Sequence, residues 1–400
     1  MALQKVLLST SGVGVGKNRE AMKSLARSIL KVIEHENPDK VVFFSTKEAD
    51  KTIEIVKNLF KEKYGYELNY EVHHVDQNDF NVCFSKMIEV ASTYQGWSIG
   101  VNYTPGTKTM SAALAAVGAF LNIPIIYVSG KREGGVVKEG TEVVLASRPY
   151  KFKDLLTLMK VSELFNSLLF NSALIEAQEL VDYPKKDILL DIIKGYLLWD
   201  SFNHEEAYNI FNKYSSKDVD FIEKFGINKG FISRLVKSQD LVRMKLLLID
   251  LISNAERRIK TGRYDDGVAR LYRAVELIAQ IALTEFGYEE PIKLEGKFAE
   301  KYKEYKDDGE FKLGLAKKIE LLKDLGWDKA DDLYLKNSKM RSLLESRNKS
   351  ILAHGFTPVG RRVAENLLAE VERFSKDVVE KYGKIKESAR FGIMSFSSMM

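Results

Sequence analysis

An arginine and a histidine near the C-terminus are the residues of this sequence that could most readily do chemistry together. They lie in the run R-N-K-S-I-L-A-H-G, from Arg347 to Gly355. If the run is helical, seven steps of about 100° place Arg347 and His354 on one face, roughly 10 Å apart along the axis. Gly355 would then be the left-handed residue after the helix, with His354 in the last turn. An imidazole suits proton transfer near neutral pH and a guanidinium holds an anion, but this spacing alone is a weak motif.

A second group of polar residues lies far upstream, from Val101 to Ala115, where a strand pattern passes into a helix pattern. The residues of this run that suit a phosphate or a polar nucleotide edge are Asn102, Thr104, Gly106, Thr107, Lys108 and Ser111. Side-chain donors, a lysine, a close backbone approach at glycine and the N–H groups of a helix start all favour an anion. By physics alone, a helix N-cap followed by small packing residues explains the run equally well.

The first loop of the chain, S-G-V-G-V-G-K-N at 11–18, also suggests a nucleotide. It fits neither phosphate-binding template, because a Walker loop needs glycine at Ser11 and Ser or Thr at Asn18, and a dinucleotide loop needs glycine at Lys17. What remains is a loop with backbone N–H groups, the hydroxyls of Thr10 and Ser11, and the charge of Lys17. It follows the first strand, where open α/β sheets bind ligands. The alternative is a plain turn.

The order of hydrophobic patterns predicts an α/β part followed by an all-α part. We expect strands at 5–10, 41–46, 68–75, 98–104, 124–130 and 141–147, and helices near 17–36, 48–63, 79–95 and 107–121. This alternation indicates a Rossmann-like, doubly wound, mostly parallel sheet with helices on both faces. After about residue 150 the apolar residues recur at helical spacing. We expect helix breaks at 182–184 and 226–230, and poor order at 395–400.

Composition limits the class of protein. A chain of 400 residues with 45% hydrophobic residues predicts two or three domains. No run approaches 18 apolar residues and the start lacks a signal peptide, so we expect a cytoplasmic protein with no membrane segment. The lone Cys83 excludes an internal disulfide and a cysteine-based zinc cluster, and we expect it to be buried. A net charge of +5 permits an anionic partner without requiring one.

The two polar runs resemble motifs of a known family. N-Y-T-P-G-T-K-T-M-S is similar to the signature loop of CARF domains, although Pro105 replaces the first glycine of the usual pattern. R-N-K-S-I-L-A-H resembles the R-x(4–6)-H motif of HEPN ribonucleases, including the polar Asn348 beside the arginine. A CARF domain, a helical spacer and a HEPN domain follow one another in the ancillary ribonucleases of type III CRISPR–Cas systems, the Csm-six type. The resemblance covers nearly the whole chain.

This resemblance implies a homodimer with a shared sensor and a shared catalytic cleft. Residues 1–152 would be the CARF domain, 153–240 the helical spacer and 241–400 the HEPN domain. The two CARF domains would bind one cyclic oligoadenylate, with cyclic tetra-adenylate favoured over the hexa-adenylate on family grounds. Each HEPN domain would contribute one arginine–histidine pair to a composite site, which is why the pair need not touch.

The resemblance also assigns roles to residues. Arg347, Asn348 and His354 would cleave single-stranded RNA, whose 2′-OH attacks the adjacent phosphate, so that neither a metal nor a cofactor is needed. The sensor would hold the activator through Thr10, Ser11, Gly12, Asn102, Thr104, Gly106, Thr107 and Lys108. Some relatives of this architecture slowly cleave their own activator in the sensor domain, and we expect the same here.

Two alternatives stay open at this stage. Residues 225–238 have the pattern of a turn and a recognition helix, which would suit a ligand-responsive transcription regulator that binds duplex DNA. A sensor with an inactive HEPN domain is the other alternative. The sequence does not disclose the ring size of the activator, the RNA base preference or the route from sensor to nuclease.

Overall fold

The chain folds into two compact units. Its computed structural model describes residues 3–14, 18–133, 136–351, 353 and 355–400. The first unit comprises Met1–Thr157 and Leu180–Tyr183, and the second comprises Leu158–Glu179 and Pro184–Met400. The predicted helix break at 182–184 is confirmed, because α6 ends at Gln178 and α7 begins at Lys186.

The first unit contains a six-stranded sheet in the order β3-β2-β1-β4-β5-β8. Neighbouring strands are parallel, except that β8 runs antiparallel to β5. The strands are β1 (Lys5–Thr10), β2 (Lys40–Ser45), β3 (Tyr70–His74), β4 (Ser98–Asn102), β5 (Ile125–Ser129) and β8 (Val143–Ser147), with a small hairpin of β6 (Arg132–Glu133) and β7 (Val136–Val137). The predicted doubly wound sheet is confirmed. Because the strand order reverses between β1 and β4, the loops that follow these two strands leave a crevice between them.

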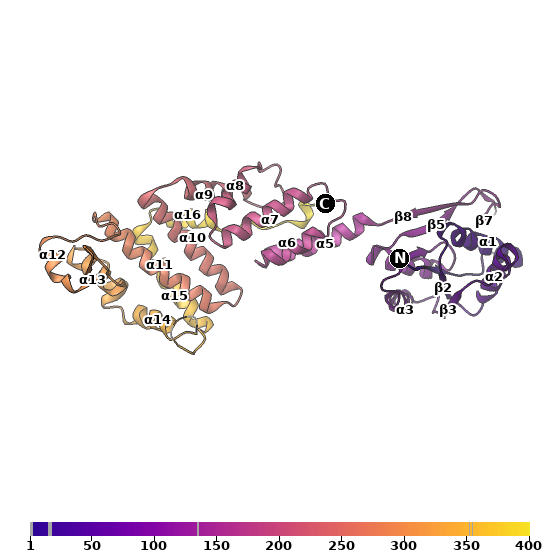
Figure 1. The fold of residues 1–400 in the computed structure, drawn as a ribbon, viewed down its shortest axis with the longest axis horizontal. Helices are drawn as coiled ribbons and strands as arrows, with labels where there is room; N and C mark the ends of the chain where they lie inside the picture. The colour runs from indigo at the N-terminus through magenta and orange to yellow at the C-terminus, as the bar shows by residue number, and fades with distance from the viewer. Residues whose placement is uncertain (1–2, 15–17, 134–135, 352, 354) are drawn as a thin grey trace. The chain divides into compact units, whose positions relative to one another are not determined.

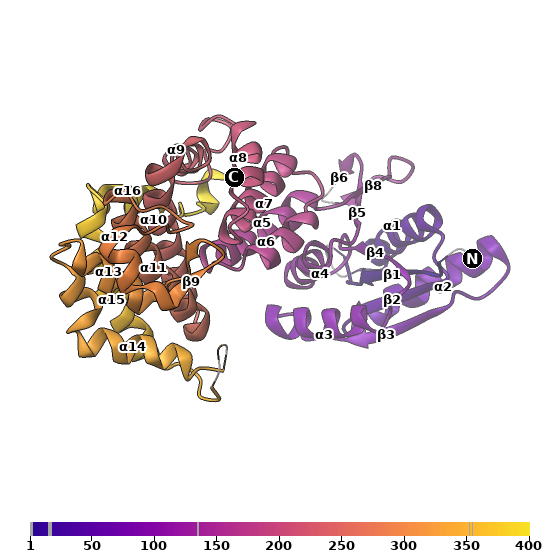
Figure 2. The same ribbon diagram turned by 60° about the vertical axis from the view of Figure 1, so that its left-hand side comes forward.

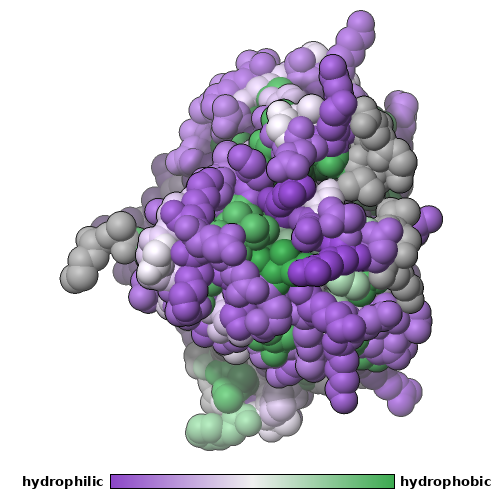
Figure 3. Space-filling view, turned by 90° about the vertical axis from the view of Figure 1, so that its right-hand side faces the viewer, coloured by the Kyte–Doolittle hydropathy of each residue, from purple (hydrophilic) through white to green (hydrophobic). Residues whose placement is uncertain are grey.

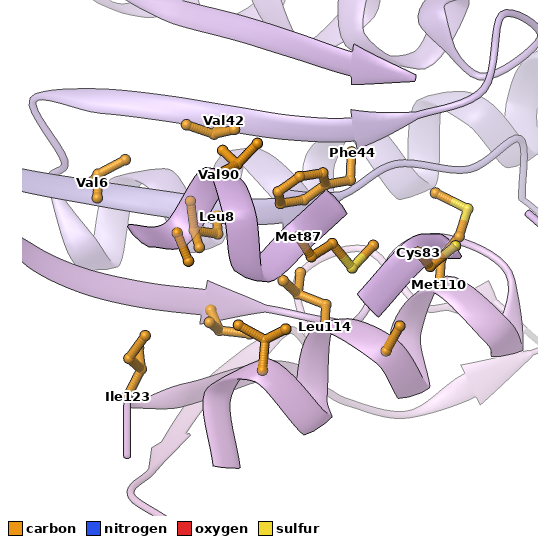
Figure 4. Packing of buried hydrophobic residues seen from close by; sticks show 14 of the residues in the cluster. Val6, Leu8, Val42, Phe44, Cys83, Met87, Val90, Met110, Leu114 and Ile123 are labelled. Carbon is orange, nitrogen blue, oxygen red and sulfur yellow. The ribbon is translucent and has the colours of Figure 1, made fainter. Parts of the chain in front are cut away.

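Helices cover both faces of this sheet (Figure 1, Figure 2). The helices are α1 (Arg19–Glu36), α2 (Asp50–Tyr64), α3 (Phe80–Ser92) and α4 (Lys108–Phe120). Leu8 and Phe44 pack against Met87 of α3 and Leu114 of α4, as Figure 4 shows. The alternate strand residues, such as Phe43, belong to the cluster formed with α1 and α2. Burial of both faces explains why the strands read as continuous apolar runs.

Glu71 on the outer strand β3 is held by three neighbours. Its carboxylate accepts a hydrogen bond from the Tyr94 hydroxyl at 2.7 Å, lies 3.1 Å from His73 Nε2 and pairs with Lys40 Nζ at 2.7 Å. Burial opposes ionisation of this carboxyl, but the hydrogen bonds from Lys40, Tyr94 and His73 outweigh it and lower the pKa of Glu71 to about 2. The cluster therefore favours the charged carboxylate in the folded chain.

The molecular face drawn in Figure 3 is predominantly hydrophilic, with a few separate hydrophobic groups. Within the described ranges, no helix is both long and apolar enough to cross a bilayer. Cys83 is fully buried in the core beside α4, as the sequence predicts, and burial raises the pKa of its thiol.

The second unit is almost entirely helical (Figure 1). The helix α5 (Tyr150–Asn166) leads into it, and the further helices are α6 (Phe170–Gln178), α7 (Lys186–Asp200), α8 (His204–Asn212), α9 (Phe225–Lys237), α10 (Asp240–Lys260), α11 (Tyr264–Glu285), α12 (Gly296–Lys301), η1 (Lys303–Tyr305), α13 (Leu315–Asp324), η2 (Asp331–Leu335), α14 (Ser338–Asn348), α15 (Arg361–Val378), α16 (Tyr382–Ala389) and η3 (Phe396–Ser398). A short hairpin of β9 (Lys306–Asp307) and β10 (Glu310–Phe311) interrupts the helices. Two-residue strands are too short to leave a period in the sequence, so this hairpin was not predicted.

A buried ion cluster joins α7 to α10. The Asp200 carboxylate accepts hydrogen bonds from Arg257 Nε at 2.8 Å and from Arg258 Nη2 at 2.6 Å. All three side chains are at least nine-tenths buried. Asn254 donates to Asp200 and accepts from Arg270 Nε of α11 at 2.6 Å. Loss of one member would leave an uncompensated buried charge, so this cluster fixes the arrangement of α7, α10 and α11.

Residues near the C-terminus pack onto α5 and α9. The Met394 N–H donates to Asn166 Oδ1 at 2.8 Å, and the Asn166 Nδ2 donates to the Met394 carbonyl at 2.9 Å. Asn228 on α9 donates to Ser388 and Arg390 and accepts from the backbone N–H of Gly392. The run 395–400 lies in the described part of the chain, and its Met399 is buried. The expectation of poor order at 395–400 was wrong, because Met399 is buried and the Ser395 N–H donates to the Phe221 carbonyl at 2.9 Å.

Candidate functional site

A cavity of about 440 Å³ lies at the carboxyl ends of the first unit's strands. Its lining includes five of the eight residues predicted to bind the activator, namely Ser11, Gly12, Thr104, Gly106 and Thr107. These residues follow β1 and β4, the two strands between which the order of the sheet reverses. The sequence therefore brings both predicted loops to one crevice, as the general rule for open α/β sheets requires.

Glycines allow the two loops to approach each other closely. A Cβ at Gly12 would lie 3.0 Å from the Gly106 Cα, and a Cβ at Gly106 would lie 2.9 Å from the Thr10 Cβ. Gly106 also has φ of +117°, which side-chain-bearing residues rarely adopt. The wall of the cavity is consequently backbone at this point, and a larger residue at position 106 would push the loops apart.

Side chains of the β4 loop hold its shape. The Thr107 hydroxyl donates to the Gln77 carbonyl at 3.1 Å and accepts from the Met110 N–H at 3.3 Å, so it caps α4. The Thr104 hydroxyl accepts from the Val128 N–H at 2.9 Å. The N-cap interpretation of this run, which physics alone left open, is therefore correct for Thr107, and the same residue also lines the cavity.

The other three predicted ligand residues do not line this cavity. Asn102 is fully buried, donates to the Ser9 hydroxyl at 3.1 Å and accepts from the Thr104 N–H at 3.2 Å, so it supports the loop from below. Thr10 is fully buried beneath Gly106, and its hydroxyl has no hydrogen-bond partner among the described residues. Lys108 is exposed at the start of α4.

The cavity has polar lining residues that the motifs did not reveal. They come from the loops after β2 and β3 and from α1, and they are Ser24, Ser28, Thr46, Glu48 and Gln77. The carboxyl ends of parallel strands meet at one edge of a sheet. The residues that follow the second and third predicted strands could therefore have been predicted to line the cavity.

The arginine of the C-terminal motif lies at the end of α14. Arg347 is half-buried, and its Cζ lies 4.7 Å from the centroid of the Tyr272 ring on α11. Its Nη1 donates to Asn348 Oδ1 at 3.2 Å. Among the described residues no carboxylate pairs with this guanidinium. Arg347 is thus oriented by an aromatic face and an amide, while its charge remains available for an anion.

The helix does not continue to position 354, and in this respect the sequence analysis was wrong. It ends at Asn348, and the C-cap residue Lys349 has ordinary right-handed angles. Gly355 is not a left-handed cap. It packs directly on the backbone, because a Cβ there would lie 2.0 Å from the Lys349 carbonyl oxygen. His354 lies outside the described residues.

The segment after α14 is folded back on the end of the helix. The Gly355 N–H donates to the Ser350 carbonyl at 3.0 Å, and the Thr357 N–H donates to the Lys349 carbonyl at 3.3 Å. A parallel bridge joins Ser350 to Thr357. Gly355 and Thr357 are therefore fastened to the end of the arginine's helix through Lys349 and Ser350.

Three family models match successive parts of the chain. The model described as CRISPR-associated protein (Cas_APE2256) matches residues 21–137, the Csm6 6H domain matches 154–241 and the Csm6 HEPN domain matches 237–379. The chain belongs to the Csm6 family. The resemblance to CARF–HEPN ancillary ribonucleases of CRISPR systems is confirmed. The match to the Csm6 HEPN domain implies a ribonuclease. Ribonucleases of this family are activated by cyclic oligoadenylates.

A solved structure shares this fold. Enterococcus italicus Csm6 bound to cyclic hexa-2'-fluoro-hexa-dAMP is 16% identical to this Csm6-family chain, with a TM-score of 0.57 over 96% of this chain and 100% of that one. Can2 from Sulfobacillus thermosulfidooxidans in complex with cyclic tetra-adenylate is 13% identical, with a TM-score of 0.26 over 51% of this chain and 68% of that one. No curated protein sequence matches. The predicted fold class, α/β followed by all-α, is confirmed.

The helix-turn-helix alternative fails in this Csm6-family chain. The expected break at 226–230 lies inside α9, which runs unbroken from Phe225 to Lys237. Its supposed recognition face is buried, because Phe231, Ile232 and Leu235 belong to the core. The two glycines of the segment misled the sequence analysis, since an isolated glycine is tolerated inside a helix that packs tightly. The segment also lies within the part matched by the Csm6 6H domain.

Proposed function

We propose that this Csm6-family chain acts as a homodimer that cleaves single-stranded RNA without a metal when a cyclic oligoadenylate occupies the cavity of the first unit. The observation that supports this most directly is the state of Arg347. This guanidinium lies at the end of α14 within the part matched by the Csm6 HEPN domain, fixed by Tyr272 and Asn348, with no carboxylate paired to it in the described chain. In this proposal, residues 1–152 sense, 153–240 connect and 241–400 cleave.

The proposed reaction uses the nucleophile that RNA carries. The 2′-hydroxyl oxygen attacks the adjacent phosphorus, the bond from phosphorus to the 5′-oxygen breaks, and a 2′,3′-cyclic phosphate and a 5′-hydroxyl result. His354 takes or supplies a proton in this exchange, and Arg347 stabilises the added negative charge. Asn348 uses its Oδ1 to accept from Arg347, which leaves its amide N–H groups to donate to a phosphate oxygen.

Exposed apolar residues around the histidine support the homodimer. Ile351 is 61% exposed and Phe356 is 94% exposed, and the two flank position 354 in the sequence. A phenylalanine so fully in water is costly, and a second copy of the same surface would cover it. An isologous contact at this loop would bring two arginine–histidine pairs to one phosphate.

The activator is proposed to bind the cavity between the β1 and β4 loops. Its lining includes the Thr104 and Thr107 hydroxyls, the buried Ser11 and the backbone of Gly12 and Gly106, and the N-terminus of α4 begins beside it. We expected cyclic tetra-adenylate from the family resemblance. The relative in complex with a cyclic hexa-adenylate analogue makes the larger ring the direct rival.

A direct test is to incubate the purified chain with a fluorogenic single-stranded RNA and with each ring in turn. Arg347→Ala and His354→Ala should each lower activator-dependent cleavage by about 10²–10⁴-fold, with the dimer intact. Arg243→Ala is the matched control, because Arg243 is exposed on α10 and takes no part in the site. Unchanged cleavage by both site variants would refute the catalytic assignment. Ring binding without any cleavage by the parent chain would instead establish a non-catalytic sensor.

Slow cleavage of the ring by the sensor is a finer part of the proposal. Each adenylate carries a 2′-OH beside a phosphodiester, so positioning that hydroxyl could suffice. Thr10 is buried under Gly106, so the predicted residues with hydroxyls that line the cavity are Ser11, Thr104 and Thr107. Ser11 is itself buried, with its hydroxyl 3.4 Å from the Ala49 carbonyl oxygen. His354→Ala protein should convert a labelled ring to linear products over hours, and Ser11→Ala should stop this. A ring that stays intact would leave the sensor as a receptor only.

A further inference from the structure

A second cavity, of about 490 Å³, opens beside the arginine of the HEPN motif. Neither the sequence motifs nor the proposed cleavage chemistry accounts for it. The lining residues that matter here are Tyr272, Tyr305, Lys317, Tyr334, Arg341 and Asn348. All of them belong to the second unit and lie within the part matched by the Csm6 HEPN domain. The cavity is therefore a feature of the nuclease part of the chain.

Three tyrosines from three different elements form its aromatic lining. Tyr272 lies on α11, Tyr305 in η1 and Tyr334 in η2, and each ring is partly accessible. The element η2 is a π-helix, a rare conformation that often marks functional sites. Three separately positioned rings that remain partly in water are more than the core requires, because a core aromatic side chain is normally covered.

The cavity is continuous with the catalytic motif. Asn348 lines it directly, and Arg347 stacks on the Tyr272 ring with its Cζ 4.7 Å from the centroid. A group held between the tyrosines would therefore be a neighbour of whatever phosphate Arg347 binds.

The charge of the lining favours an anionic polymer. Arg341 is exposed and forms no ion pair with any described residue. Lys317 already pairs with Glu320 at 2.7 Å, and Glu345 on the rim pairs with Lys349 at 2.8 Å. The charge left unpaired at the rim is thus positive, which attracts a phosphate backbone.

We propose that this cavity binds an unstacked base of the single-stranded RNA substrate, adjacent to the phosphate that is cleaved. The proposal rests on the proposed ribonuclease function. Aromatic side chains bind single-stranded bases by stacking on their faces, and the positive rim tracks the backbone. A base paired within a duplex could not enter such a cavity, so the same feature accounts for a preference for single strands.

The test measures binding of a non-cleavable probe, a fluorescein-labelled single-stranded RNA with 2′-fluoro groups, to dimeric His354→Ala protein with activator present. Tyr334→Leu and Tyr305→Leu should each weaken probe binding roughly tenfold, because a stacked base is lost. Tyr334→Phe keeps the ring and should bind like the parent. Tyr288→Leu, a partly exposed tyrosine outside the cavity, is the matched control. In the active background the leucine variants should raise KM more than they lower kcat.

A second variant needs no change in the aromatic lining. Arg341→Ala removes an exposed side chain and should lower the slope of log affinity against log salt by about 0.7, whereas Arg243→Ala should not. Failure of the parent to bind or cleave RNA would refute the proposed function itself. If the parent binds and cleaves RNA, and the leucine and Arg341 variants do so equally well, the base-binding cavity alone is refuted. Equal losses in Tyr334→Phe and Tyr334→Leu would also overturn it, because they would show that stacking is irrelevant.

Discussion

Replacement of Gly106 by alanine would test whether the two sensor loops must touch. The new Cβ would lie 2.9 Å from the Thr10 Cβ and 3.0 Å from its hydroxyl oxygen, in a residue whose φ is +117°. Backbone strain of this kind costs about 1–3 kcal/mol, and overpacking a buried contact adds about 1–3 kcal/mol. We expect Gly106→Ala to lose about 2–6 kcal/mol of local stability and to weaken activator binding.

Gly140→Ala is the control for a strained glycine outside the loops that follow β1 and β4. Gly140 also has positive φ, +81°, but a Cβ there would meet no described atom within 4 Å, so this variant carries backbone strain without such a contact. Hydrogen exchange of the β1 and β4 amides in the full chain reports local opening. Because the strain in Gly140→Ala falls on another turn, exchange of the β1 and β4 amides in Gly106→Ala should be about 25-fold or more faster than in Gly140→Ala. Equal protection of β1 and β4 in the two variants would refute the reasoning, since the loops would then have room to separate without cost.

Three further perturbations probe other parts of the chain. Lys108→Ala should require more activator for half-maximal cleavage and leave cleavage without activator unchanged, because it removes an exposed charge at the sensor helix; an unaltered activator titration would contradict this. Gly355→Ala should lower kcat by about 10²-fold without affecting activator binding, since its Cβ would displace the backbone from the Lys349 carbonyl. A Cβ at Gly360 would meet no described atom within 4 Å, so Gly360→Ala should cleave normally. Folding lowers the pKa of Glu71 from 4.5 to about 2, so its carboxylate stabilises the fold above pH 4.5 and this contribution is lost as the pH falls toward 2. The stability of Glu71→Gln against acid unfolding should therefore depend less on pH across that interval.

The sensor part of the fold could be predicted well because each strand is buried on both faces. Leu7 and Leu8 pack into opposite cores, so β1 appears in the sequence as a continuous apolar run with polar residues directly after it. Ser11 and Gly12 directly follow that strand, so the sequence predicts them at the sheet edge where ligands bind. The positions of the Thr10 and Asn102 side chains could not be predicted. A polar side chain at a strand end can point into the crevice or lie beneath the loop, and a neighbour distant in sequence decides which.

The nuclease part was harder to predict because its local signals conflict with its packing. Gly355 was interpreted as a helix cap from its type, yet the structure uses it for close approach to Lys349, a contact that helical spacing cannot disclose. The glycines of α9 were interpreted as a break, but buried Phe231 and Ile232 hold the helix together. The tyrosine cavity was not predicted either, because its rings come from α11, η1 and η2 and share no sequence period.

The hydrogen bonds of Met394 to Asn166 also set a time scale for synthesis. The two residues are 228 positions apart in the chain. At roughly 5–20 residues per second, a ribosome needs about 10–45 s to make the residues between them. Until residues 388–394 have been made, Asn166 of α5 and Asn228 of α9 lack the backbone partners that these residues supply. The connecting helices therefore cannot finish folding in the order in which they emerge, and a nascent chain would expose this unfinished surface to chaperones and proteases until the nuclease segment had also been made.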